Sequence, residues 1–292
     1  MKKYMMKRNI FCLILCSLSC LGALSCSSAP KKPAEVFIQR TAGERQLELA
    51  NRDADRGNFQ IALEMLVEAR RIAVSTDDPS LRIRTTLSRG NILFSLGRRE
   101  EAAAAWDGAL AEAESLKNRE LAAVCRIYRA RGQLLAAVNG VSGAASGNEA
   151  AQTAAAVKTE VNRELGFIKS DTLSIALGWT VIGLAEKEGR RFTEAEAAVK
   201  KALDIHEKGR YLEQAAYDWY LIASIRSVAG KYDTAQTALE QAIALDRRAE
   251  NSWGLATDWR ALAEVYRKAG KSAEAEAAAA RSKEIFESLG TE

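Results

Sequence analysis

The sequence is poor in the residues that build metal, redox and disulfide sites. It holds one histidine, His206, and five cysteines, of which only Cys125 lies beyond residue 26. A lone His cannot supply the usual zinc ligand set, and Cys125 has no partner for a disulfide framework. No base is placed to activate Cys125, and no Gly-Lys-Ser/Thr follows Gly140 and Gly143 to form a phosphate loop. The sequence therefore predicts no catalytic residue, no metal and no cofactor.

An excess of positive charge is also missing once the first 25 residues are set aside. Four of the 42 lysines and arginines lie there and none of the 38 acidic residues does, so the remaining chain carries no net charge. Binding to nucleic acid requires a concentrated basic surface. Nucleic acid is therefore not an expected partner.

Residues 1–25 are predicted to be a leader and not part of the fold. A basic start precedes an apolar run over residues 10–24, which is too short to span a membrane comfortably as a helix. Small residues then precede Cys26, which resembles a bacterial lipoprotein signal, in which that Cys is acylated and becomes the new N-terminus. Cys20 is a weaker competitor for this role. The alternative is an ordinary secretory signal that is cut nearby.

Residues 26–40 are predicted to be the lipidated Cys26 followed by an extended tether. Pro30 and Pro33 occur there without any apolar periodicity. The lipoprotein resemblance implies a bacterial cell-envelope protein that is anchored to a membrane by acyl chains and faces the periplasm or the surface. Ser27, which stands where an inner-membrane lipoprotein often has Asp, favours the outer membrane.

The rest of the chain is organised around a stretch that recurs every 40 residues. Its markers are Trp219, Ile222, Ala223, Gly230, Tyr232, Ala235, Leu239 and Ala242. Forty residues later they return as Trp259, Leu262, Ala263, Gly270, Ser272, Ala275, Ala279 and Ser282. About forty residues earlier they are Trp179, Ile182, Gly183, Gly189, Phe192, Ala195, Val199 and Ala202. Self-similarity at such a period predicts a stacked repeat array.

Each unit is predicted to be two helices joined by a glycine turn. Apolar and small residues recur at helical spacing on both sides of Gly230, which can take a left-handed conformation beyond a helix end. Asp233 is expected to cap the second helix, with Gln236 completing a capping box. The tryptophans at the head of the last three units are expected to be mostly buried between helices.

This spacing resembles the tetratricopeptide repeat, whose pattern places a Trp, a Leu-Gly pair, a Tyr and two Ala along one helical hairpin. The resemblance implies an all-α, right-handed superhelix of about six hairpins that binds other proteins and has no catalytic activity. The period of 40 instead of 34 and the missing final Pro depart from the family. A solenoid of the HEAT or armadillo kind, with periods of about 40–47 residues, is the alternative.

The repeats are predicted to fill residues 41–292. The expected units cover 43–80, 83–118, 120–168, 170–210, 212–250 and 252–290. The third is degenerate, because a Gly/Ser/Asn-rich segment at 139–148 replaces the tight turn. That segment is either a partner-contacting protrusion or a tolerated surface insertion. No polar capping helix follows the last unit, which hints at self-association into a homo-oligomer.

The resemblance also implies where a partner would bind, because the first helix of each hairpin lines the concave surface in this family. The inward-facing positions carry Asn51, Arg84, Asn91, Arg126, Arg129, Gln133, Tyr217, Tyr220, Arg260, Glu264 and Arg267. Arginines and tyrosines suit an extended peptide or an acidic segment held by bidentate Arg–carboxylate bonds. The alternative is that the arginines only solvate the inner wall. The family's clamp for a C-terminal carboxylate is not carried over, because only Asn51 and Asn91 match it.

Two functions follow from the resemblance. The first is a membrane-anchored envelope scaffold or adaptor that binds a protein or peptide partner through the concave surface. The second is an accessory subunit of an envelope transporter or enzyme, with a ligand cavity inside the superhelix. Fold resemblance alone does not choose between them.

Overall fold

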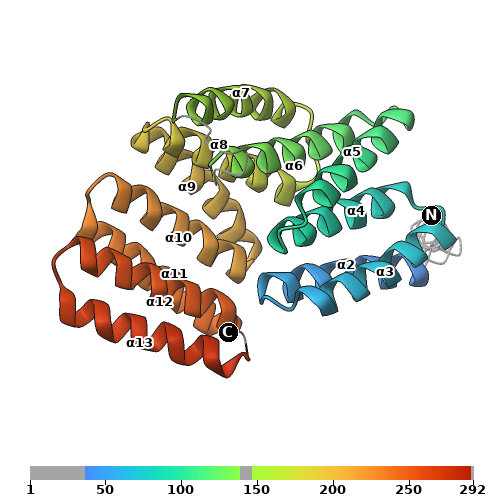
Figure 1. Ribbon diagram of the computed structural model, residues 1–292. Helices are drawn as coiled ribbons and strands as arrows, with labels where there is room; N and C mark the ends of the chain where they lie inside the picture. The colour runs from blue at the N-terminus through green and yellow to red at the C-terminus, as the bar shows by residue number, and fades with distance from the viewer. Residues whose placement is uncertain (1–36, 139–146, 291–292) are drawn as a thin grey trace, which may run out of the picture. The chain divides into compact units, whose positions relative to one another are not determined.

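The computed structural model describes residues 37–138 and 147–290. In these ranges the chain forms twelve α-helices and no strand (Figure 1). The helices are α2 Ile38–Asp55, α3 Phe59–Ser75, α4 Pro79–Ser95, α5 Arg99–Ser115, α6 Arg119–Val138, α7 Gly147–Leu165, α8 Thr172–Glu188, α9 Phe192–Gly209, α10 Leu212–Val228, α11 Tyr232–Ala249, α12 Ser252–Lys268 and α13 Ser272–Ser288. The predicted leader, Cys26 and residues 139–146 of the predicted loop lie outside the described residues.

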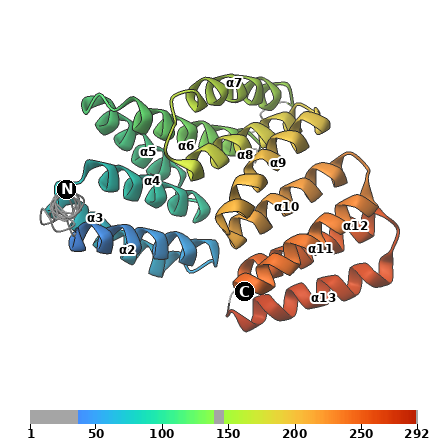
Figure 2. The same cartoon turned by 180° about the vertical axis from the view of Figure 1, so that it is seen from behind.

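Consecutive helices pair into six hairpins, from α2–α3 to α12–α13 (Figures 1 and 2). Each second helix also packs on the first helix of the next hairpin, as α3 does on α4. The first helices, α2, α4, α6, α8, α10 and α12, form one layer of the array, and the second helices form the other. The expected all-α superhelix of helical hairpins is confirmed. In the described ranges no helix has the length and apolar content needed to cross a bilayer.

Glycines turn the chain inside most hairpins, as the sequence predicts. Gly57, Gly97, Gly230 and Gly270 take φ between 75° and 81°, a region that favours glycine because it has no Cβ. The fourth hairpin differs, because its left-handed residue is Arg190 with φ 57°, one position after the expected Gly189.

The expected cap at Asp233 is wrong. Helix α11 begins at Tyr232, its N-cap is Lys231, and no side chain caps it. Side-chain caps stand instead at first helices, where the carboxylates of Asp78 and Asp171 accept from the amides of Leu81 and Ser174 at 3.0 Å. A carboxylate there binds an amide that has no partner within the helix and meets the positive end of the helix dipole.

The core is built from alanines and branched residues between the two layers, with one buried tryptophan. Trp106 is only 3 % exposed. In contrast, Trp179, Trp219 and Trp259 are half-buried, so the expectation that they are mostly buried is only partly met. Cations of second helices lie over two of them: the ammonium of Lys201 is 3.7 Å from the centre of the Trp179 ring, and the guanidinium of Arg281 is 4.8 Å from that of Trp259.

Candidate functional site

Two buried polar pairs link consecutive hairpins among the last three. One pair joins α9 to α10, and the other joins α11 to α12. The Nδ1 atom of His206 on α9 lies 2.6 Å from a carboxylate oxygen of Asp218 on α10. Forty residues on, Asp246 and Asp258 form the equivalent pair between α11 and α12, within hydrogen-bonding reach of each other. Burial raises the pKa of Asp218 from its usual value. The lone histidine is therefore a structural partner of a buried carboxylate.

Asp246 and Asp258 are buried against each other, an arrangement that favours a proton held between the two carboxyl groups. Both side chains are 3 % exposed, and Asn251 donates to Asp246 at 3.0 Å. Burial first, and the negative charge of Asp246 second, raise the pKa of Asp258 to about 9. Burial is also the main reason why the pKa of Asp246 rises to about 7. Two carboxyls so close cannot both ionise without strong repulsion.

A pocket of about 310 Å³ lies between α10 and α12, on the layer of first helices. Three residues of the predicted groove set, Tyr220, Arg260 and Glu264, line it together with Lys268. The ring of Tyr217 stacks on that of Tyr220, with the two ring centres 6.1 Å apart. Tyr217 as a residue is 43 % exposed. The structure thus brings four of the predicted residues together at one place on the inner wall.

Positive charge at this pocket is left without acidic partners. Among the described residues, neither Arg260 nor Lys268 has a carboxylate within ion-pair distance, whereas Glu264 pairs with Arg267. Burial lowers the pKa of nearby Lys187 on α8, and the positive charge of Lys268 adds to that lowering. An anionic group would relieve this repulsion between like charges.

The predicted arginines of the second and third hairpins are already occupied. Arg84 pairs with Glu44 across α4 and α2 at 2.7 Å. Arg126 binds Glu114 at 2.6 Å and the buried Glu164 at 3.3 Å, on α5 and α7. Arg129 lies 3.4 Å from Asp107, also on α5. Arg126 and Arg129 therefore face the second-helix layer.

The register of α6 explains this placement. Arg126 stands seven residues after the start of α6, which is where Trp179 stands in α8. Trp179 contacts Lys201 of the second helix α9, and Arg126 contacts Glu114 and Glu164 of the second helices α5 and α7. The residue that faces the first-helix layer is Arg131, whose charge acts on Asp55 of α2. Sequence reasoning missed Arg131, and aligning the third unit by its helix start would have found it.

The remaining predicted residues are spread over the wall. Asn51 and Gln133 are exposed, at separate places on α2 and α6. Asn91 is half-buried, and its side-chain oxygen is buried without a hydrogen-bond partner among the described residues. These three do not join the α10–α12 pocket.

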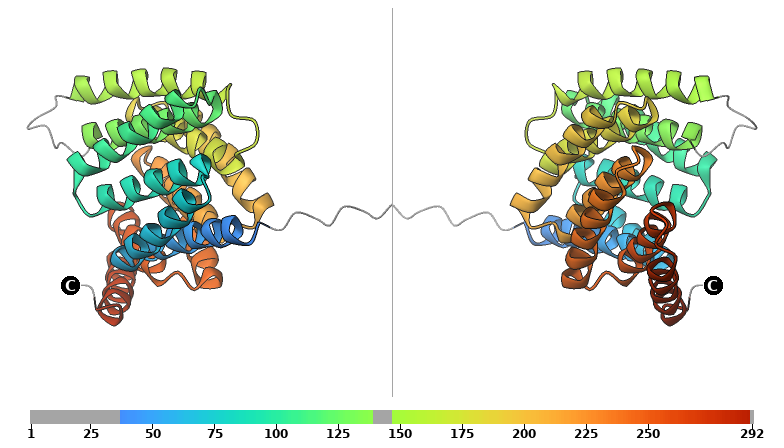
Figure 3. Two further views of the ribbon diagram at one scale, coloured as in Figure 1. Left: turned by 90° about the vertical axis from the view of Figure 1, so that its right-hand side faces the viewer. Right: turned by 90° about the vertical axis from the view of Figure 1, so that its left-hand side faces the viewer.

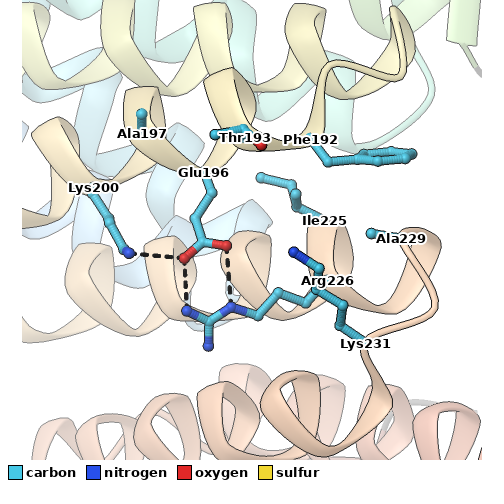
Figure 4. A pocket seen from close by; sticks show the side chains of 9 residues that line it. All are labelled: Phe192, Thr193, Glu196, Ala197, Lys200, Ile225, Arg226, Ala229 and Lys231. Carbon is cyan, nitrogen blue, oxygen red and sulfur yellow. Dashed lines mark hydrogen bonds and ion pairs between the residues drawn. The ribbon is translucent and has the colours of Figure 1, made fainter.

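A second pocket, of about 290 Å³, lies between α9 and α10 (Figure 4). Lys200 and Arg226 both bind the carboxylate of Glu196, at 2.8 and 2.7 Å. Hydrogen bonds from Arg226, more than any other contact, lower the pKa of Glu196 to about 2. Because these charges satisfy one another, this pocket offers less to a charged ligand than the α10–α12 pocket does.

Cys125 is the one free cysteine among the described residues, and it is buried. Burial raises the pKa of Cys125 to about 12, so its thiol stays protonated at neutral pH. Within residues 37–138 and 147–290, no three His, Cys, Asp or Glu side chains come together as metal ligands.

The last two hairpins identify the repeat. Residues 213–288 match the family model of the tetratricopeptide repeat. The resemblance to the tetratricopeptide repeat is confirmed. No curated protein matches the sequence.

Solved structures share the tetratricopeptide-repeat fold with this chain. BtubC (BKLC) from P. vanneervenii is similar with a TM-score of 0.53 at 20% identity, over 85% of this chain and 92% of that one. A Rap protein complexed with Competence and Sporulation Factor gives 0.54 at 15% identity, over 85% and 70%. Aspartyl phosphate phosphatase F from Bacillus subtilis gives 0.52 at 10% identity, over 88% and 77%. At such identities the likeness concerns the fold alone.

Proposed function

We propose that the protein is a membrane-anchored adaptor of the bacterial cell envelope that binds an extended segment of a partner protein at the α10–α12 pocket. The observation that carries the binding half is the pocket itself, where two cations without a carboxylate partner among the described residues, Arg260 and Lys268, stand beside stacked tyrosines. Tyrosine and arginine are the residues that most often anchor protein interfaces. The predicted leader and the lipoprotein-like sequence before Cys26 support the membrane half.

The chemistry of the pocket favours an acidic segment. Arg260 can bind a carboxylate through two parallel hydrogen bonds, and Lys268 adds a second positive charge. Tyr217 and Tyr220 offer apolar faces to the intervening side chains. The likeness to a Rap protein solved in complex with a factor agrees with a binding role for this architecture.

The membrane anchor is tested by replacing Cys26. The Cys26→Ala variant is expected to move from the membrane fraction to the soluble fraction, because it would lack the acyl chains. Two or more acyl chains are needed for stable attachment, since a single acyl chain binds the membrane only marginally. Fractionation of cells with an antibody to the protein measures this, and Cys20→Ala is the control that stays on the membrane. Membrane association that persists in Cys26→Ala would contradict the anchor.

The binding site is tested by reversing its charges. The double variant Arg260→Glu with Lys268→Glu is expected to weaken capture of the partner from detergent-solubilised envelopes by roughly tenfold or more, by loss of charge-assisted bonds and by new repulsion. Capture by the wild type is also expected to fall as salt is raised. Quantitative mass spectrometry of the captured proteins measures both effects.

The control is Lys208→Glu with Lys283→Glu, which changes the net charge equally on exposed positions of α9 and α13. An unchanged partner set in a folded Arg260/Lys268 variant argues against this site. A small molecule that co-purifies in place of a protein would favour the accessory-subunit function.

A further inference from the structure

The first hairpin contacts the fifth and sixth hairpins, which a linear stack of repeats does not require. Arg56, in the α2–α3 turn, donates to the carbonyl oxygen of Ala249 at 2.9 Å and to the carboxylate of Glu213 at 3.2 Å. Gln214 donates to the carboxylate of Asp55 at 2.8 Å. In Figure 1 the inner end of the blue α2–α3 hairpin lies next to the ends of the orange helices, and Figure 3 shows this hairpin at the same level as those helices. The array is therefore closed into a ring within the described residues.

An aromatic contact accompanies these polar ones. The ring of Trp253, at the start of α12, packs edge-to-face with the ring of Phe59, with the two ring centres 6.2 Å apart. It also covers Gly57, where an added Cβ would lie 2.8 Å from the indole. On its other side Trp253 packs on Phe286 of the last helix. We call this contact between the first hairpin and the last two, made by Asp55, Arg56 and Phe59 with Ala249, Glu213, Gln214 and Trp253, the junction. Trp253 forms its apolar part.

Negative charge gathers at the same junction. Asp55 faces Glu213 and Gln214 of α10, Arg131 of α6 and Asp246 of α11. Asp55 is an exposed residue, but its carboxyl group lies among side chains of α6, α10 and α11, and this crowding first, and the charge of Glu213 second, raise its pKa to about 7. On the far side Asp246 faces Glu213 and its partner Asp258. Arg56 is the basic residue that the hydrogen bonds place among these carboxyls.

The junction is separate from the hydrophobic core. One core cluster joins the first two hairpins, another joins the second to the fourth, and a third joins the fourth to the sixth. In the described part of the chain none of them crosses from α2–α3 to α10–α12. Breaking the junction would therefore leave every hairpin packed on its neighbours, which is the condition for a change between two discrete states.

We propose that the array alternates between this closed ring and an open superhelix, that Arg56 and Trp253 hold it closed, and that the carboxyl groups gathered beside Arg56 make closure depend on pH. Opening uncovers the ends of α2 and α10 and enlarges the first-helix surface offered to a partner. The switch belongs to the array itself and needs neither the membrane anchor nor a partner.

The direction of the pH effect follows from where protons bind. Asp55 binds a proton more tightly in the closed ring than in the open form, where its pKa would return to about 3.9. Its contribution to closure is complete below that open-state value and is lost as the pH rises through about 7. Closure is therefore favoured in mild acid, and the ring opens as the pH rises.

Fluorine NMR of the full chain with fluorotryptophan tests the proposal. The five tryptophans give five resonances, and Trp253→Phe assigns the one of interest. Arg56→Glu is expected to lower the ratio of closed to open Trp253 signal by roughly tenfold or more, because it replaces the cation that binds Glu213 with a further carboxylate. Adding Glu213→Arg to it restores the pair with its charges exchanged and should recover the closed signal.

The matched control is Arg71→Glu, which breaks an exposed pair with Glu68 on α3 and should leave Trp253 unchanged. Raising the pH from about 6 to about 8 should shift wild-type signal to the open position, and Asp55→Asn should remove that shift. The other four resonances report whether each variant is folded. A Trp253 signal that is the same in wild type and in folded Arg56→Glu, or that does not respond to the charge exchange, overturns the proposal.

Discussion

Replacing Trp106 with alanine is expected to lower the free energy of unfolding by about 3–5 kcal/mol, as large-to-small changes in a core do. Its indole lies between Gly90 of α4 and Gly132 of α6, and an added Cβ at either glycine would overlap the ring. The indole nitrogen also donates to the carbonyl oxygen of Leu87 at 3.3 Å. The surrounding helices cannot fill the space, because both facing positions are glycine.

Urea denaturation measures this loss, and Trp219→Ala is the matched comparison. Trp219 heads its repeat but is only half-buried, so less of its surface returns to water in the variant. We therefore expect a smaller loss for Trp219→Ala than for Trp106→Ala. If the two losses are equal, or the order is reversed, the packing described for Trp106 is incorrect.

The second large effect is a fall in stability with rising pH, which comes from Asp246 and Asp258. A carboxyl with a raised pKa stabilises the fold fully below its unfolded value, near 3.9, and this contribution is lost as the pH rises through the folded value. Those folded values are about 7 for Asp246 and about 9 for Asp258. Each proton released lowers the stability by up to about 1.4 kcal/mol per pH unit.

Asp258→Asn tests this directly, because its amide can donate to Asp246 at any pH. The variant is expected to lose less stability than the wild type between about pH 6 and about pH 9, and to be the more stable protein at the upper end. Denaturation at a series of pH values measures both. Asp204→Asn, at an exposed ion pair on α9, is the control that keeps the wild-type slope. An unchanged slope in Asp258→Asn would show that the buried pair holds no shared proton.

Helical spacing and the fixed period predict the fold because every unit repeats the same local rule. The stripe around Trp219, the glycine turn at Gly230 and the small residues at Ala223 and Ala235 describe one hairpin. Contacts between neighbouring repeats then follow from the hairpin alone. The same local rule predicts Tyr220 and Arg260 on one wall, where the structure places them beside a pocket.

Local spacing was less informative about which way an irregular unit faces. Counting through the third unit assigns Arg126 to the groove, but the long insertion shifts the count, and the helix start turns this residue toward Glu164. The buried acids also went unrecognised, because Asp246 and Asp258 resemble surface residues until the two helices that carry them are packed together. Lysines and acidic residues occur at the same helical spacing on both layers, so the spacing does not show which of them are buried.

The sequence by itself determined the repeat, the helical hairpins and the types of residue on the first helices, because these depend on residues within one turn or one unit. Only the tertiary structure decided which cations remain unpaired, since Arg84 is matched by Glu44 and Arg260 by no acid among the described residues. It also decided that the first hairpin meets the fifth and sixth. That contact depends on the summed rotation of all the intervening repeats, a quantity that no single unit encodes.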